Sequence, residues 1–346
     1  MPMSVIERIQ KHTVKIYGLD DRVVSEEKIA ARRLLHPSRF DLFAKLYYIR
    51  NRQRNPELAV KVYKEHIKAF NPDLTEPGNS GKSGYDAFLS VFDNLIEQFR
   101  TEEFDPEQSL VPVTQDNILL DGAHRVAALA FWDKPVGVAR FGDVCPKADF
   151  NYDYFKRRGL SWNTMDVIAC EMTQYLPNLH VACLWPRIAD KSKAISLIGT
   201  RFYIAYEKTV NVSLRAFQRL IADVYAGQPW TQNPESLKDK SLQCFGFNRK
   251  IVFVFFVADN LNDVVALKDE IRNMYGAGKH SIHITDNCRE TQAIAKDVLI
   301  AEERAKWADA SAAGLIRQRL EERWFYFKHV QMINIKVALA RLFSLR

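Results

Sequence analysis

Apolar residues recur at helical spacing through the first hundred residues of the chain. Residues 24–70 are predicted to form helices that break at Pro37, with Ser25 as the N-cap of the first helix. Residues 85–100 repeat the pattern on a single apolar stripe. Between them, residues 71–84 are polar and contain Gly and Pro, which predicts a surface loop. The chain therefore begins with an α-rich segment.

The pattern changes to short β-type runs beyond residue 108. Two strands, a helix and a third strand are predicted in that order, over residues 109–114, 118–120, 121–130 and 136–141. The unit is thus β-turn-β-α-β.

Strands and helices then alternate. Helices are predicted over 152–176 with a break at Gly159, 213–225, 259–274 and 289–303, and strands over 180–185, 201–206, 250–257 and 281–284. Residues 250–257 form the most apolar run of the chain, which is typical of a buried central strand. The alternation indicates a second α/β layer, followed by a continuous helix from residue 301 to the end.

The predicted fold class is α/β (α+β), in three parts. A first domain covers residues 1–160, a mixed α/β domain covers 161–303 and a helical tail covers 304–346. A length of 346 residues, with 47% apolar and 26% charged residues, agrees with a globular protein. This composition excludes collagen, a disordered chain and a pure coiled coil.

Cysteine usage and hydropathy bear on the compartment. The five cysteines show no CxxC or CxxH pairing, which argues against a disulfide framework or a zinc knuckle and favours a reducing cytoplasm. The N-terminus lacks the apolar stretch of a secretory signal, and no segment reaches the roughly 18 apolar residues needed to cross a bilayer. We expect a cytoplasmic protein that is soluble or at most bound to a membrane surface.

The net charge of +7 raises the question of a nucleic-acid partner. The basic excess lies towards the two ends of the chain, whereas residues 71–135 contain 12 acidic and 4 basic residues. Such a stretch repels phosphate backbones unless local donors overrule it. Nucleic acid is therefore not the expected partner.

The turn Asp121-Gly-Ala-His-Arg125 carries the sharpest chemical signal. Gly122 allows a close approach of the backbone to an anion, and the first amides and positive dipole end of the helix would point at that anion. His124 and Arg125 add donors at the same point. Asp121 could orient the histidine or hold Mg²⁺. On local chemistry alone, an ordinary turn with Asp121 as N-cap and Arg125 at the surface is equally compatible with these residues.

Residues 110–141 resemble the core of the ParB/sulfiredoxin superfamily, in which a strand pair delivers a Gly-x-His-Arg or Gly-x-Arg-Arg turn into a phosphate-binding helix. The resemblance implies that Gly122, Ala123, His124 and Arg125 receive the phosphates of ATP or a related nucleotide.

Departures from the relatives narrow the function. Sulfiredoxin has a reactive cysteine where this chain has Ala123, so reduction of sulfinic acids is not expected. No helix-turn-helix follows residues 150–158, which argues against DNA segregation. The small-molecule kinases of the superfamily remain, and they transfer the γ-phosphate of ATP to a hydroxyl group.

The whole chain also resembles uncharacterised proteins associated with bacterial capsule and O-antigen loci. The resembling pieces are residues 36–45, 81–84 and 278–286, together with the Asp121 turn. This resemblance implies a carbohydrate hydroxyl as the phosphate acceptor.

Phosphoryl transfer needs a carboxylate to orient the hydroxyl proton, and cations to neutralise phosphate charge. Asp121 is the first candidate for the catalytic carboxylate and metal ligand, with Asp41 and Asp153 behind it; Asp41 is alternatively a solvated residue on the polar side of its helix. Lys82 could close over the phosphates from its Gly-Lys-Ser-Gly loop. That loop lacks the upstream glycine of a P-loop, because Glu76 stands there.

Lys279 and His283 are candidates for an acceptor or phosphate site in the second domain, because His283 lies on a predicted strand that precedes a helix. His280 and His283 are expected on opposite faces of that strand, which argues against shared metal coordination.

The tail over residues 324–346 is rich in aromatic, leucine and basic residues. It is predicted to pack on the body or on a second subunit of a homo-oligomer. The alternative is an interfacial helix on anionic lipid.

The predicted function is an ATP- and Mg²⁺-dependent phosphotransferase that acts on a sugar or glycan hydroxyl in surface-polysaccharide synthesis. A glycosyltransferase that uses a nucleotide sugar or sugar diphosphate is the first alternative. A nucleic-acid-binding regulator switched by nucleotide is the second.

Overall fold

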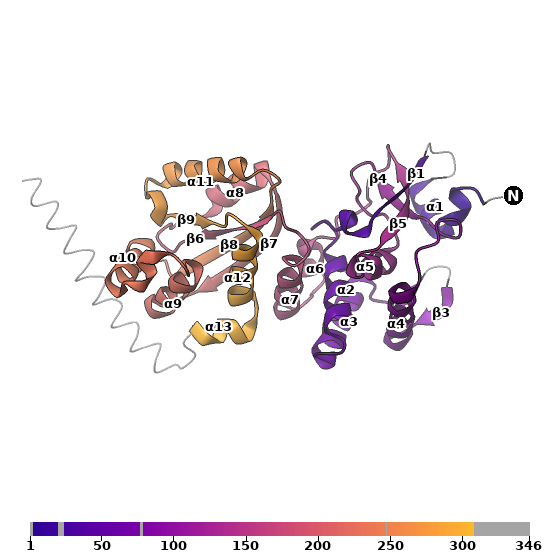
Figure 1. Ribbon diagram of the computed structural model, residues 1–346, viewed down its shortest axis with the longest axis horizontal. Coiled ribbons are helices and arrows are strands. Elements are labelled where there is room, and N and C mark those ends of the chain that lie inside the picture. The colour runs from indigo at the N-terminus through magenta and orange to yellow at the C-terminus, as the bar shows by residue number, and fades with distance from the viewer. Residues whose placement is uncertain (1–2, 20–23, 77–78, 247, 308–346) are drawn as a thin grey trace, which may run out of the picture. The chain divides into compact units, whose positions relative to one another are not determined.

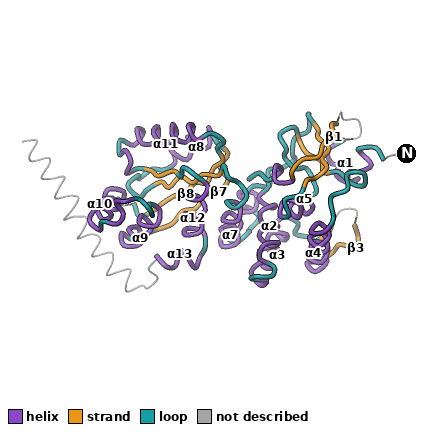
Figure 2. The backbone as a smooth tube through the Cα atoms, viewed as in Figure 1, coloured by secondary structure: helices purple, strands orange, loops and turns teal. Residues whose placement is uncertain are grey.

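The computed structural model describes residues 3–19, 24–76, 79–246 and 248–307. It divides into two compact units, unit 1 over residues 1–176 and unit 2 over residues 177–346. Each unit has its own sheet and its own covering helices (Figures 1 and 2). The protein is therefore of the mixed α/β class, as predicted. None of the described helices is both long and apolar enough to span a membrane.

Unit 1 is built on a three-stranded mixed sheet in the order β1-β5-β4. Its strands are β1 (Val24–Ala30), β4 (Val111–Thr114) and β5 (Pro135–Phe141); β1 pairs with β5 antiparallel and β4 pairs with β5 parallel. The helices are α1 (Lys11–Tyr17), α2 (Phe40–Asn51), α3 (Pro56–Phe70), α4 (Tyr85–Thr101), α5 (Ala123–Phe131), α6 (Tyr152–Arg157) and α7 (Trp162–Met172). Two 3-10 helices, η1 (Ile6–Arg8) and η2 (Ala31–Leu34), complete the unit.

The opening of unit 1 differs from the sequence prediction at β1. Residues 24–30 form a strand and Ser25 caps no helix, so the predicted helical start was wrong. Pairing with β5 and two ion pairs, Arg8 with Glu26 and Arg140 with Glu27, hold this segment extended. Tertiary contacts therefore override its helical pattern.

Two further local predictions are corrected by the structure. Residues 71–84 contain a short hairpin of β2 (Thr75–Glu76) and β3 (Asn79–Ser83) in place of a loop. Residues 118–120 form no strand but one isolated bridge, Val113 with Leu119. The chain still reverses there, because Thr114 N donates to Ile118 O at 2.9 Å and Leu120 N donates to Pro112 O at 3.0 Å.

Unit 2 is built on a four-stranded antiparallel sheet in the order β7-β8-β6-β9. Its strands are β6 (Leu179–Leu184), β7 (Tyr203–Asn211), β8 (Lys250–Val257) and β9 (Ile282–Ile284). The helices are α8 (Ser192–Arg201), α9 (Leu214–Val224), α10 (Pro234–Cys244), α11 (Leu261–Tyr275), α12 (Cys288–Leu299) and α13 (Ala301–Trp307), with 3-10 helices η3 (Pro229–Gln232) and η4 (Gly278–His280).

Strand β8 is buried on both faces, as its continuous apolar pattern predicts. Val252, Val254 and Phe256 pack in the cluster formed with α8 and α11. Phe253 and Phe255 project to the opposite face and are also fully buried. Figure 1 shows α8 and α11 on one side of this sheet and α9 and α12 on the other. Helices on both sides thus bury a strand that antiparallel sheets often leave half exposed.

The predicted boundary at residue 160 falls between α6 and α7. Helix α7 packs on α2 of unit 1, and the contacts place the division after Leu176. The predicted tail over residues 304–346 lies outside the described residues from position 308 onward.

The two faces of β8 offer a matched stability test. Changing Phe255 or Phe256 to Ala leaves a cavity on opposite sides of the sheet, so each variant is expected to lose about 3–5 kcal/mol of unfolding free energy. Lys250→Ala, at the exposed start of the strand, serves as the control. Urea unfolding measures all three; a near-neutral effect of either Phe variant would contradict burial of that face.

Candidate functional site

A cleft of about 870 Å³ opens in unit 1 beside the start of α5. Its walls come from α1, α2, α3 and α4 and from residues 120–125. The predicted residues Asp121, Gly122, Ala123, His124 and Arg125 all line it, and so does Asp41. The structure thus brings together residues that lie up to 84 positions apart in the sequence.

Gly122 is the N-cap of α5 and has the left-handed values φ 88° and ψ 24°. This left-handed backbone favours glycine, and a Cβ atom there would also lie 2.9 Å from Arg125 Nη2 and 3.3 Å from Val111 Cγ2, so a larger residue would force the Arg125 side chain to move. No side chain caps α5, and the interpretation of Asp121 as its N-cap was wrong. The positive end of the α5 dipole therefore faces the cleft without a carboxylate of its own at the cap.

Asp121 is half-buried and lines the cleft, and a hydrogen bond from α1 orients its side chain. Thr13 Oγ1 donates to Asp121 Oδ2 at 2.8 Å. Among the described residues no group of three His, Cys, Asp or Glu side chains is placed to hold a metal ion. Asp121 therefore fits Mg²⁺ only as one carboxylate that shares the ion with phosphate oxygens, which is a common arrangement for this metal.

A buried ion-pair cluster lies under the turn. Arg39 Nε and Nη2 donate to the two carboxylate oxygens of Asp41 at 2.9 and 3.0 Å, and Lys45 Nζ donates to Asp41 Oδ2 at 2.9 Å. Arg39 Nη1 also donates to the carbonyl oxygen of Leu119 at 2.6 Å. The cluster therefore ties α2 to the segment that leads into the Asp121 turn.

The interpretation of Asp41 as a solvated residue was wrong, because the residue is 1% exposed. Burial alone would raise the pKa of Asp41, but Arg39 and Lys45 hold that pKa far below its ordinary range. Both oxygens of this carboxylate are engaged by cations. Its contacts suit a residue that positions the site better than one that takes a proton from substrate.

His66 and Tyr63 of α3 connect this cluster to His124. Lys45 Nζ lies 3.3 Å from His66 Nε2, and His66 Nδ1 lies 2.8 Å from the carbonyl oxygen of Tyr63. The Tyr63 hydroxyl lies 2.9 Å from His124 Nε2. Burial, then the Lys45 charge, lowers the pKa of His66 to about 3, so its ring is neutral at physiological pH.

Arg125 lies folded against the turn. Its Nη1 donates to Ser109 Oγ, and its guanidinium packs over Gly122. The charge of Arg125 is thus held at the N-terminus of α5, where it adds to the helix dipole.

The charge of the cleft favours an anionic ligand. Five basic residues line it, Lys11, Arg39, Lys45, Arg125 and Lys147, against the two carboxylates Asp41 and Asp121.

The cleft is also lined by aromatic rings that lie among its basic side chains: the Arg39 guanidinium is 5.3 Å from the centroid of the Phe150 ring, and Lys45 Nζ is 6.0 Å from that of Phe70. The rings that line the cleft are those of Tyr17, Phe70, Phe88, Phe92 and Phe150. At the mouth of the cleft, Ile16 of α1 and Val91 of α4 are 45% and 46% exposed. A cleft lined by both basic side chains and aromatic rings suits a ligand that has both an anionic and a flat apolar part.

Sequence reasoning missed Arg39, Lys45, Tyr63 and His66. Two spacings contained the signal: Asp41 and Lys45 stand at i,i+4 on α2, and Tyr63 and His66 stand at i,i+3 on α3. No pattern along the chain indicates that these two helix faces meet under the turn.

The remaining predicted residues lie away from this cleft or outside the described side chains. Asp153 is on α6 and does not line the cleft. Lys82 belongs to β3, and its side chain is outside the described part of the structure.

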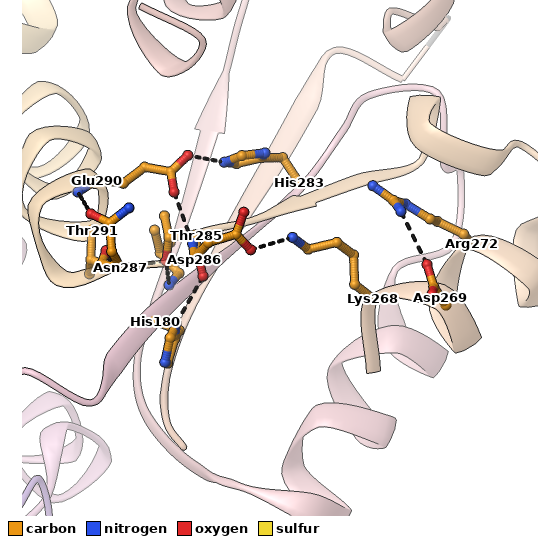
Figure 3. A network of polar contacts seen from close by, with 11 residues as sticks. His180, Lys268, Asp269, Arg272, His283, Thr285, Asp286, Asn287, Glu290 and Thr291 are labelled. Atoms are coloured by element: carbon orange, nitrogen blue, oxygen red, sulfur yellow. Dashed lines mark hydrogen bonds and ion pairs between the residues drawn. The ribbon is translucent and has the colours of Figure 1, made fainter. Parts of the chain in front are cut away.

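Lys279 and His283 belong to unit 2. His283 is on β9, where its Nε2 lies 2.8 Å from Glu290 Oε1 (Figure 3). Glu290 Oε2 also accepts from Asp286 N at 2.9 Å. His280 lies in η4, before the strand begins, so the expectation that it shares a strand with His283 was wrong.

Comparison with protein families, with curated proteins and with solved structures finds no match to this chain.

The neutral state of His66 has a measurable consequence. In the unfolded chain its pKa returns to about 6.5, so between pH 6.5 and about 3 only the unfolded state binds the proton. Proton binding by the unfolded state lowers the free energy of unfolding. The contribution of His66 is therefore complete above pH 6.5, and it is lost as the pH falls towards 3, by up to about 1.4 kcal/mol per pH unit.

Gln does not titrate, so His66→Gln should lose less unfolding free energy than the wild type between pH 7.5 and 4.5. Urea unfolding across that range measures the difference. Parallel curves for the two proteins would show that His66 is not held neutral.

Proposed function

We propose that unit 1 binds ATP and transfers its γ-phosphate to a hydroxyl group of a sugar or glycan. The observation that carries this proposal is the cleft at the start of α5, where a helix N-terminus without a side-chain cap and an excess of basic side chains lie together with aromatic rings. Triphosphate and adenine are the anionic and flat parts that such a cleft accommodates.

The phosphates are proposed to lie against Gly122, Ala123, His124 and Arg125. The left-handed glycine allows a close approach of the backbone, and the charge of Arg125 lies beside it. This is the layout that the resemblance to the ParB/sulfiredoxin superfamily implies for the first domain. The resemblance and the cleft support it independently.

Asp121 is the proposed general base. In the reaction, the acceptor oxygen forms a bond to the γ-phosphorus, the bond to the bridging oxygen of ADP breaks, and the hydroxyl proton passes to the carboxylate. Thr13 orients this carboxylate through Oδ2, and no other described group is bonded to it. Asp121 would also hold Mg²⁺, and the ion would supply positive charge that offsets the charge of the phosphates.

His124 is proposed to bind the transferred phosphate. Its Nε2 is turned towards Tyr63, and its ring packs edge-on against Phe92 with centroids 4.7 Å apart. These contacts fix the ring orientation. A positioned ring adds to catalysis because it needs no reorganisation when the charge develops.

Nucleotide binding is tested with Arg125→Ala. ATP with Mg²⁺ is expected to raise the melting temperature of the wild type, and the variant should need at least about tenfold more ATP for the same shift, because a charge-assisted contact contributes about 1.5–3 kcal/mol.

Arg32→Ala is the matched control. Arg32 pairs with Asp133 at 3.2 Å and does not line the cleft. An equal shift in Arg125→Ala and in the wild type would place the nucleotide elsewhere.

The reaction class is tested separately with a donor screen. The purified protein is incubated with ATP or with nucleotide sugars and a panel of saccharides, and the products are identified by mass spectrometry. Release of ADP together with a phosphorylated saccharide supports the phosphotransferase. Consumption of a nucleotide sugar would instead establish a glycosyltransferase that uses the same anion-binding cleft.

A further inference from the structure

A group of basic side chains gathers in unit 2 where the end of α10, the loop after β6, η4 and α11 meet. We call it the η4 cluster, and its members are Arg187, Lys240, Arg272, Lys279 and His280. Sequence analysis named two of them, Lys279 as a candidate binding residue and His280 in the argument against a shared metal site with His283. The cluster lies in a different unit from the nucleotide cleft.

Hydrogen bonds hold the cluster together. Lys240 Nζ donates to the carbonyl oxygen of Lys279 at 2.8 Å. Cys244 Sγ, at the end of α10, lies 3.8 Å from His280 Nδ1. Arg187 N donates to the carbonyl oxygen of Cys244 at 2.9 Å. The end of α10 is therefore the common support of these basic residues.

Carboxylates do not balance this charge. Within the described part of the chain, no carboxylate oxygen forms an ion pair with the side chains of Arg187, Lys240 or Lys279, whereas neighbouring Lys238 pairs with Glu235 at 3.9 Å.

Arg272 is the one member of the cluster with a described acidic partner. It pairs with Asp269 at 3.1 Å, but its Nε is buried and has no hydrogen-bond partner. A buried N–H group of this kind normally has a hydrogen-bond acceptor, and an anion bound at the cluster would supply one.

The pKa directions within the cluster agree with an excess of positive charge. Burial, then the charges of Lys240, Lys279 and Arg187, lowers the pKa of His280 to about 4. Burial is also the largest cause that lowers the pKa of Lys240, and the Lys279 charge adds to it. A bound anion would offset the neighbouring positive charges that lower the pKa values of His280 and Lys240.

An aromatic pair adjoins the basic side chains. Lys240 Nζ lies 5.4 Å from the centroid of the Tyr225 ring, which lies 5.2 Å from that of Trp230. Tyr225 also contacts His283 edge-on at 5.0 Å, so the predicted residue His283 lies behind this aromatic pair. Half-buried Tyr and Trp rings offer an apolar face with a polar edge, which matches the C–H face and hydroxyl rim of a sugar.

We propose that the η4 cluster and the Tyr225–Trp230 pair form a binding site for a saccharide that carries a phosphate or carboxylate group. The basic side chains bind the anionic group, and the two rings pack against the sugar. Only the identification of this saccharide as the phosphate acceptor rests on the proposed function, because binding itself requires no nucleotide.

The test uses the full-length protein without nucleotide. Glucose 1-phosphate and glucuronate are titrated separately, with neutral glucose and inorganic phosphate as the comparison ligands. NMR signals of the His280 ring and the Trp230 indole report binding in unit 2 and are independent of the cleft in unit 1. Both signals are expected to shift with the anionic sugars, and at lower concentration than with glucose or phosphate.

Lys240→Ala should weaken this binding about tenfold, because one charge-assisted hydrogen bond is lost. Lys238→Ala, two residues away on α10, should leave it unchanged. If Lys240→Ala does not fold, the exposed Lys279→Ala takes its place, with the same expected direction.

Three results would overturn the proposal: no shift with either anionic sugar, equal shifts with inorganic phosphate or glucose, or unchanged binding in the lysine variants. The two proposals fail separately. Phosphoryl transfer to a saccharide without a His280 shift would remove the η4 site alone, whereas a His280 shift without phosphoryl transfer would remove only the phosphotransferase.

Discussion

The buried pair of Arg39 and Asp41 fixes the position of the candidate site. Arg39 bonds the carboxylate of α2 with two nitrogens and the carbonyl oxygen of Leu119 with a third, so one guanidinium joins a helix to the segment entering the turn. Breaking such a pair leaves an uncompensated buried charge, which costs about 3–5 kcal/mol. The geometry at Gly122 therefore depends on an interaction that no residue of the turn itself provides.

The same cluster sets the electrostatics of the cleft floor. Arg39 and Lys45 bring two positive charges, Asp41 brings one negative charge, and the low pKa of His66 keeps that ring neutral. The cluster therefore has a net charge of one positive near the N-terminus of α5. The carboxylate of Asp121 offsets this charge, and Arg125 together with the helix dipole restores a positive potential there. In a low-dielectric interior, a buried positive charge attracts an anion more strongly than the charge of an exposed lysine does. Attraction for an anion is thus built into the scaffold beneath the turn.

Sequence patterns predicted most elements of the fold but little of the support of the site. The interior strand β8 was found because its apolar run matches burial on both faces, and the turn at 121–125 was found because its chemistry is local. β1 was missed because its pairing with β5 joins segments more than a hundred residues apart. Asp41 was found as a candidate, but its partners depend on how α2 and α3 pack, which residue spacing does not contain.

The charge of a sequence segment is also a poor guide to the charge of a surface. Residues 71–135 are rich in carboxylates, yet none of the three on α4 lines the cleft. Asp93 accepts from Tyr48 and Arg52, Glu97 pairs with Arg52, and Asp86 pairs with Lys64. Four of the five basic residues of the cleft come from outside this acidic segment: Lys11, Arg39 and Lys45 from α1 and the start of α2, and Lys147 from the loop after β5; only Arg125 belongs to it. An acidic sequence segment and a positively charged cleft can therefore coexist in unit 1, because attraction of a small anion depends on the few charges that line the cleft.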